Sequence, residues 1–216
     1  LELIARVEER VHAAPVALPE PSRWPQVTAA SDEYRRVRLS GRFQHERETL
    51  VQALTELGSG FWGLTPLAEG DGRIVVAKRG FVPPERRDRA SRMAGEPAGE
   101  VTLVGLLRIS EPGGGFLRRN DAAAGRWYSR DVAAIADARS LQAGQVAPFF
   151  VDAEKDPQAA AGQPVGGLTV ISFRNSHLVY ALTWFALALL VAGAAWWVWR
   201  EEKRLRRAQG GAQQAD

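Results

Sequence analysis

Cysteine is missing from this sequence altogether, and histidine occurs only three times in 216 residues. Without cysteine the chain has no disulfide, no thiolate metal site and no cysteine nucleophile. The three histidines, His12, His45 and His177, are too far apart for a zinc site built from ligands close in sequence. The nucleophile elbow Gly-x-Ser-x-Gly is also missing. These absences argue against an exported enzyme, and we do not expect catalysis.

Signals for nucleotide or nucleic-acid binding are weak as well. Gly58 to Gly63 matches Gly-x-Gly-x-x-Gly, but dinucleotide binding needs a helix after this motif, whereas a strand is expected here. Outside residues 200–216 the chain has 23 basic and 22 acidic residues. Because this balance provides no excess of positive charge, we expect no nucleic-acid partner.

One stretch contains no charge of either sign. Leu178 to Trp199 comprises 22 residues without a charged side chain, and about 20 helical residues cross the roughly 30 Å hydrocarbon core of a bilayer. A buried core helix is the alternative, but the run is longer than such a helix needs. We therefore expect a transmembrane helix over residues 175–199 and contact with membrane lipid.

The flanks of this run predict its orientation. Five basic residues lie in the tail 200–216, and only Arg174 lies near the other end. The positive-inside rule places the tail in the cytoplasm, or a mitochondrial matrix, and residues 20–174 on the outer side. Such a domain needs an export signal, so we expect a first transmembrane helix upstream of Leu1. The alternative is a tail-anchored protein with a cytoplasmic domain. Richness in Ala, Arg and Gly favours a bacterial inner (cell) membrane, with the domain periplasmic.

The remainder of the chain predicts an α+β fold. Residues 1–19 combine an amphipathic helix with an extended lead-in, and residues 20–174 form the outer domain. Alternating apolar and polar residues with intervening turns indicate an antiparallel sheet or partial β-barrel with short helices. The expected strands are two within 34–50, then 60–67, 73–82, 100–109, 127–129 and 146–151, with a short helix at 132–138 capped by Asp131.

Polar residues of the outer domain show no grouping that reveals a site. Residues 83–92 are helix-compatible, and their four arginines indicate a solvated helix face, with an anionic-lipid or partner surface as the alternative. Nothing in the sequence places two carboxylates in one cleft, so each is expected to be solvated. The acidic residues concerned include Glu46, Glu48, Asp71 and Asp131.

His177 stands at the entrance of the apolar run. On a helix it shares a face with Tyr180 and Trp184, separated by small residues that leave room for a flat ligand or a neighbouring helix. A neutral imidazole is a common ligand of haem iron, and a haem within a bilayer needs aromatic and apolar walls. The alternative is that His177, with Asn175 and Ser176, only caps the helix at the membrane interface.

Several segments, in the same order, resemble the Surfeit locus protein 1 family of cytochrome c oxidase assembly factors. Residues 175–185 are similar to the family's Asn-Asn-His-Leu-x-Tyr-Ala-x-Thr-Trp-Phe signature, with Ser176 in place of the second Asn. Residues 78–83 resemble its Asn-Arg-Gly-Trp-Val-Pro, with Lys78 and Phe81 as departures. Further similar segments are 10–19, 37–43, and the spaced set Phe116, Asn120, Trp127 and Asp131.

The resemblance implies a function as well as a fold. Family members have two membrane helices flanking an exported domain and assist oxidase biogenesis where subunit I receives haem a. For this chain the resemblance implies a membrane-anchored assembly factor that binds haem a transiently. It implies that His177 ligates the iron and that Tyr180 and Trp184 form the pocket walls. The implied partners are oxidase subunit I, assembly intermediates and haem a synthase. The alternative is a structural chaperone that stabilises subunit I without binding haem.

Overall fold

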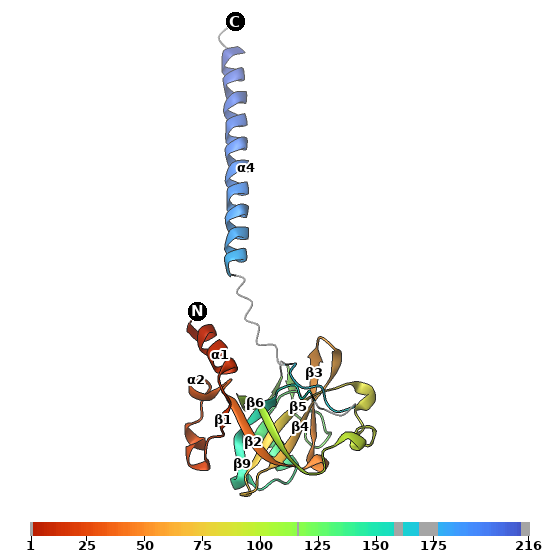
Figure 1. Cartoon of the computed structure of the whole chain (residues 1–216). Helices are drawn as coiled ribbons and strands as arrows, with labels where there is room; N and C mark the ends of the chain where they lie inside the picture. The colour runs from red at the N-terminus through yellow and green to blue at the C-terminus, as the bar shows by residue number, and fades with distance from the viewer. Residues whose placement is uncertain (1, 116, 158–161, 169–176, 213–216) are drawn as a thin grey trace. The chain divides into compact units, whose positions relative to one another are not determined.

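The computed structural model describes residues 2–115, 117–157, 162–168 and 177–212. The chain divides into two units, Leu1–Val170 and Ile171–Asp216. The first unit contains a β-barrel with short helices, and the second contains a single long helix (Figure 1).

Seven strands of the first unit form one sheet in the order β1-β2-β6-β9-β5-β4-β3. A further antiparallel pairing of β2 with β4 joins the sheet across its open side, so that five strands form a partial barrel. The β1–β2 and β5–β9 pairs are parallel, and the remaining pairs are antiparallel. The strands are β1 Val16–Ala17, β2 Arg36–Phe43, β3 Thr49–Thr55, β4 Gly58–Ala68, β5 Ile74–Val82, β6 Glu100–Ile109 and β9 Val146–Ala153.

Barrel closure depends on a glycine in β2. Val37, Leu39 and Gly41 point inward, alternating with three arginines and Ser40 as the sequence predicts. At Gly41 a Cβ atom would lie 2.3 Å from the carbonyl oxygen of Ala68, the last residue of β4. Only a residue without a side chain permits this approach of the two strands.

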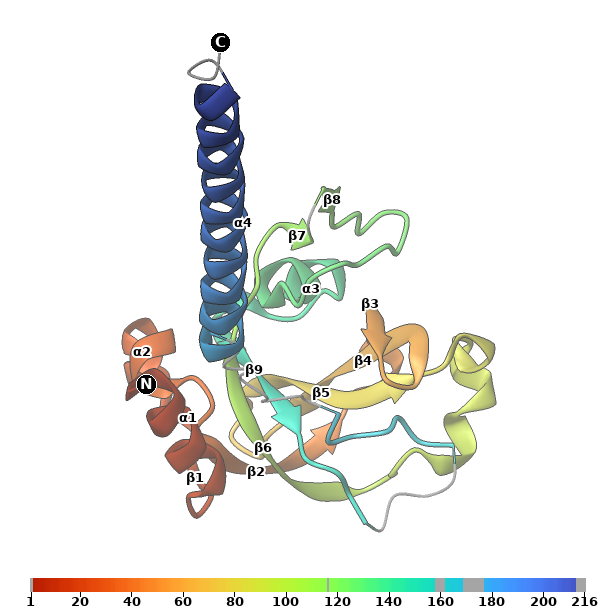
Figure 2. The ribbon, with the colours of Figure 1, turned by 90° about the horizontal axis from the view of Figure 1, so that it is seen from above.

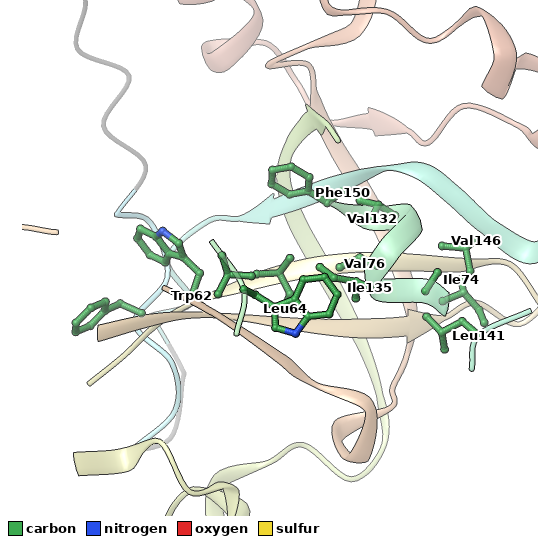
Figure 3. Packing of buried hydrophobic residues seen from close by; sticks show 13 residues of the cluster. Trp62, Leu64, Ile74, Val76, Val132, Ile135, Leu141, Val146 and Phe150 are labelled. Atoms are coloured by element: carbon green, nitrogen blue, oxygen red, sulfur yellow. The ribbon is translucent and has the colours of Figure 1, made fainter. Parts of the chain in front are cut away.

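Two hydrophobic clusters lie on opposite faces of the sheet. One includes side chains from all five barrel strands and occupies the interior, where Leu18 and Trp24 pack at its edge. The other lies outside β3, β4, β5 and β9 and is covered by α3 (Val132–Ala138), whose Val132 and Ile135 point into it (Figure 3). Because β5 is covered on both faces, it is almost continuously apolar.

Short helices and hairpins complete the first unit (Figure 2). Helix α1 coincides closely with the predicted amphipathic helix, and Asp131 caps α3 by accepting a 3.1 Å hydrogen bond from the Ala134 amide. The elements are α1 Glu2–His12, α2 Ala29–Asp32, the hairpin β7 Gly114–Gly115 with β8 Arg118–Arg119, and 3-10 turns at Pro21–Gln26, His45–Arg47 and Ala143–Gln145.

The structure corrects three local predictions. Residues 127–129 do not form a strand, because Trp127 makes one isolated bridge to Val51 while its side chain is buried in the outer cluster. Residues 83–92 form successive 3-10 turns, not a regular helix. The second strand expected within 34–50 begins only at Thr49 and continues to Thr55, where it forms a hairpin with β4. The 3-10 turns are Pro84–Arg86 and Arg89–Ser91, followed by Met93–Gly95.

The second unit consists of α4, His177–Ala212. Within its segment Tyr180–Arg204 the most apolar 18-residue window has a mean hydropathy of 1.9, and the segment is long and apolar enough to cross a membrane. None of its most apolar window is buried against protein, so the helix fits a membrane anchor. The helix extends beyond the predicted residue 199, because the charged tail that follows is also helical.

Candidate functional site

The residues predicted to contact haem all belong to α4. His177 is the first residue of the helix, but its side chain lies outside the described residues. Tyr180 and Trp184, four residues apart, lie on one helix face and are 66% and 68% exposed. Their aromatic surfaces are therefore free to pack against a ligand, a lipid or another helix. Iron ligation by His177 stays a prediction.

Aromatic and basic side chains meet at the other end of the apolar segment. The Arg200 guanidinium lies 5.3 Å from the Trp196 ring centroid, and the Lys203 ammonium lies 3.9 Å from that of Trp199. Such pairs are typical of the boundary between membrane and water, where tryptophan and basic residues are enriched.

A second group of candidate residues lies in the barrel, at the end of β5. It centres on residues 78–83, the Lys-Arg-Gly-Phe-Val-Pro segment. Lys78 is buried and pairs with buried Asp152 of β9, with 2.7 Å between Nζ and Oδ2. Its ammonium also lies 4.0 Å from the ring centroid of Trp62. Burial lowers the pKa of Lys78, while the Asp152 carboxylate counteracts that shift.

The neighbouring Arg79 points to the other side of the strand and has neutral partners. Its Nη1 donates to Nδ1 of His45 at 3.3 Å, and its Nη2 donates to Oε1 of Gln163. The guanidinium also lies over the ring of Phe43, 4.7 Å from the centroid. Burial lowers the pKa of Arg79, although nearby carboxylates oppose the shift.

Two bidentate ion pairs surround Arg79. Arg92 donates to both carboxylate oxygens of Glu48 at 3.1 and 2.6 Å, and this pair is almost fully buried. Arg89 donates to both oxygens of Glu96 at 2.9 and 2.7 Å. The predictions of a solvated Arg92 and a solvated Glu48 are therefore wrong, because folding brings the two together across 44 residues of sequence.

The tautomer of His45 follows from its contacts. Its Nε2 lies 3.1 Å from the Pro97 carbonyl oxygen, which can only accept a hydrogen bond. The Nε2 atom therefore carries a proton, and Nδ1 accepts from Arg79. With this tautomer His45 satisfies both contacts and orients Arg79, and its Nδ1 also lies 3.9 Å from Oε1 of Glu96.

Gly80 explains how a distant segment reaches this group. Its φ is +146°, and a Cβ there would lie 2.3 Å from the carbonyl group of Val165. Phe81 and Val165 exchange backbone hydrogen bonds of 2.9 Å in both directions. A side chain at residue 80 would push the segment 162–168 away from β5, and with it Gln163.

A cavity of about 680 Å³ lies between this segment and the barrel. Arg79 and Gln163 contribute polar groups to its wall, and Phe43, Val101 and Leu103 contribute apolar ones. Volume and lining fall within the range of small-molecule sites in proteins, which are mostly apolar with a few oriented polar groups.

Sequence reasoning did not find this barrel group. Residues 78–83 overlap the strand predicted over 73–82 and resemble a family segment, but neither observation attaches a role to Arg79 or its partners. One local signal existed, since Lys and Arg inside an otherwise apolar strand are rarely buried unless they are paired. The partners could not be read from the sequence, because His45 and Gln163 lie 34 and 84 residues from Arg79.

The other family-like set is structural where it is described. Asn120 accepts hydrogen bonds from the amides of Tyr128 and Ser129 at 2.8 and 3.2 Å and donates to the Ser129 hydroxyl at 3.0 Å. It thereby holds the loop that delivers Trp127 to the outer cluster. Phe116 lies outside the described residues.

The fold and the site together define the class of protein. The chain combines a small partial β-barrel with an apolar helix that fits a membrane anchor. The model of the SURF1 family matches residues 1–189, and the chain belongs to this family. The resemblance seen in the sequence is thus confirmed.

The chain is similar to proteins of Mus musculus, Homo sapiens and Monosiga brevicollis. Surfeit locus protein 1 of Mus musculus is 33% identical over 204 residues, covering 87% of this chain and 63% of the mouse protein. The Homo sapiens protein is 33% identical over 206 residues, covering 87% and 65%. A SURF1-like protein of Monosiga brevicollis is 32% identical over 214 residues, covering 94% and 78%. The chain thus spans somewhat less than two thirds of the length of the mammalian relatives.

Proposed function

We propose that this protein is a membrane-anchored assembly factor for cytochrome c oxidase that helps to deliver haem a to subunit I. Membership of the SURF1 family supports an assembly role, not an enzymatic one. The observation that carries the haem proposal is the position of His177 at the first residue of an apolar helix, on the face of Tyr180 and Trp184.

The residues of α4 suit a transient haem site. His177 would supply one neutral imidazole ligand to the iron. Tyr180 and Trp184 would form the walls, since both aromatic side chains are exposed and only small residues separate them on that face. The haem is cargo here, and one protein ligand on an open helix face allows its release to an acceptor.

The proposed setting is the bacterial inner (cell) membrane. The basic residues that follow Trp199 support a cytoplasmic C-terminus, and the barrel would then lie on the periplasmic side. Subunit I, its assembly intermediates and haem a synthase are the proposed partners, with lipid around α4. A reporter enzyme that works only in the cytoplasm should be active when it is fused after Asp216. Activity of a reporter that works only outside the cytoplasm, fused at the same point, would overturn this orientation.

A second candidate function is a chaperone that stabilises subunit I without contacting haem. The observation that favours it is that Leu1–Val170 forms a compact unit of its own, which could dock on a protein partner. In that case α4 would only anchor a barrel that docks on the oxidase subunit.

The haem content of the purified protein decides between the two functions. The full-length protein is purified from cells that make haem a, and its visible spectrum and extracted haem are measured. We expect His177→Ala to lose most of the bound haem and the matched His12→Ala to retain it, because His12 is an exposed residue of α1. Unchanged haem content and spectrum in His177→Ala would exclude the ligand role and leave the chaperone function.

A further inference from the structure

We propose that the cavity beside Arg79 binds an apolar small molecule that carries a carboxylate group, and that Arg79 binds that carboxylate. The cavity lies wholly within the first unit, and the proposal does not depend on haem binding by α4. It rests on the shape of the cavity, on the partners of Arg79 and on one buried hydrogen-bond donor.

The cavity has more apolar than polar wall, and its cationic lining residues are Arg79 and Lys155. Phe43 at the end of β2 and Val101 and Leu103 of β6 are only half-buried because they line it. Pro97 and Val165 add further apolar surface from outside the barrel. A volume of about 680 Å³ accommodates a molecule much larger than an inorganic anion.

Arg79 differs from the arginines around it in its partners. Arg89 and Arg92 each face a carboxylate in a bidentate pair. Within the described part of the chain, Arg79 forms no ion pair, and its contacts are His45, Gln163 and the Phe43 ring. A guanidinium has five N–H donors, and these contacts use two, so donors remain for a ligand.

The contacts of Arg79 hold its guanidinium plane in a defined position. The Phe43 ring lies against the guanidinium, while His45 and Gln163 accept from its two terminal nitrogens. A fork of donors that is already oriented loses little freedom when it binds a planar carboxylate. The neutral partners leave the positive charge for the ligand.

Gln163 provides an independent indication of a ligand. Its Oε1 accepts from Arg79, which assigns the two ends of the amide, and its Nε2 is buried without a hydrogen-bond partner among the described atoms. Buried donors are normally satisfied, so an acceptor is expected for this Nε2, and a ligand group in the cavity would supply it. Gly95 also lines the cavity, and a methyl group there would lie 2.6 Å from this Nε2.

The surrounding charges favour a carboxylate over a phosphate. Glu48 and Glu96 already offset part of the positive charge around Arg79, and the cavity wall also carries Glu154 and Asp156 beside Lys155. A dianionic phosphate would meet more repulsion from these groups than a singly charged carboxylate. The ligand class is therefore an apolar body with one planar, singly charged acid group.

The test uses a matched pair of probes on the full chain in nanodiscs. Naphthylacetate carries the carboxylate, and naphthylacetamide is its neutral counterpart; binding is measured by saturation-transfer NMR titration. We expect the acid to bind the wild type and the amide to bind about tenfold more weakly. In Arg79→Gln the preference for the acid should disappear, and in the control Arg119→Gln, an exposed residue of β8, it should persist.

Two further variants guard against misfolding of Arg79→Gln. Arg79→Lys keeps the charge but loses the fork, so it should bind the acid more weakly than the wild type. Leu103→Trp narrows the cavity and should weaken binding of both probes. Near-UV circular dichroism verifies that each variant is folded. Equal binding of acid and amide to the wild type, no binding of either, or an acid preference that survives in a folded Arg79→Gln would overturn the proposal.

Discussion

The barrel and α4 use the same apolar residues in opposite ways. In the barrel unit Trp62 and Trp127 are 9% and 2% exposed, whereas in α4 Trp184 and Trp197 are 68% and 63% exposed. The barrel unit buries its apolar side chains in two clusters, while none of the most apolar window of α4 is buried against the described residues. The difference fits a helix that faces an apolar solvent, because water would oppose such exposure over a whole helix.

Charges follow the reverse distribution. The barrel unit buries ionised side chains in pairs such as Lys78–Asp152 and Arg92–Glu48. The apolar run of α4, from Leu178 to Trp199, has none. A protein interior can supply an opposite charge and hydrogen bonds at a fixed position, whereas hydrocarbon supplies neither.

The largest effect should come from removing half of a buried pair in the barrel. Glu48→Ala leaves the Arg92 guanidinium buried without its carboxylate, and we expect a loss of about 3–5 kcal/mol in the free energy of unfolding. Chemical denaturation followed by near-UV circular dichroism measures it. The control is Glu20→Ala, because Glu20 is 68% exposed and its partner Arg73 has other acidic neighbours. A loss below 1 kcal/mol in Glu48→Ala would show that this pair does not stabilise the barrel.

The same substitution in both regions tests which solvent each one faces. Leu54 of β3 and Leu189 of α4 are 82% and 74% exposed. Leu189→Lys should raise the free energy of membrane insertion by about 2.5–3.5 kcal/mol, whereas Leu54→Lys should change barrel stability by less than about 0.5 kcal/mol. A glycosylation-based insertion assay measures the first and denaturation the second. Normal insertion of Leu189→Lys would contradict the membrane role of α4.

A smaller loss of stability is expected where the segment 162–168 packs against Gly80 of β5. Gly80→Ala places a methyl group against Val165, and we expect a loss of about 1–3 kcal/mol in stability as the segment 162–168 shifts. Gly144→Ala is the control, because nothing lies within 4 Å of its Cβ position. Thermal unfolding compares the two variants. If both variants melted at the same temperature, the close contact between Gly80 and Val165 would not contribute to the stability of the barrel.

The smallest effect is expected in the dependence of stability on low pH, to which Glu96 contributes. Burial acts to raise the pKa of the Glu96 carboxyl, but hydrogen bonds from Arg89 and nearby positive charge outweigh it and hold the pKa below its ordinary value of 4.5. The ionised carboxylate therefore stabilises the fold above about pH 4.5, and this contribution is lost as the pH falls through the folded-state pKa. Denaturation at a series of pH values should show a shallower loss below pH 4.5 in Glu96→Gln than in the wild type.

Glu69 provides the contrasting pH dependence. Burial raises its pKa above the ordinary 4.5, despite the charge of Arg73. Its protonated form is therefore favoured in the folded state, and the associated stability is lost as the pH rises. In the wild type the free energy of unfolding should fall as the pH rises above 4.5, and Glu69→Gln should remove this fall. A Glu69→Gln variant with the same acid response as Glu96→Gln would contradict these assignments.

The family and the element types were accessible from the sequence alone. A run of 22 residues without charge predicts an apolar helix wherever it lies, because the signal depends only on local composition and length. Alternation in residues 36–43 predicts a strand with one inward face for a similarly local reason. The signature at residues 175–185 identified the family.

Only the tertiary structure decided how the barrel closes and what surrounds Arg79. Closure needs Gly41 beside the end of β4, and the parallel pairing of β5 with β9 joins strands about 70 residues apart. His45, Arg79 and Gln163 come from separate segments of the chain that the folded barrel brings together. Their polar groups can be buried because each finds a partner from a distant part of the chain. A local sequence pattern cannot identify that partner, since hydrogen bonds and ion pairs depend on position in space and not on spacing in the chain.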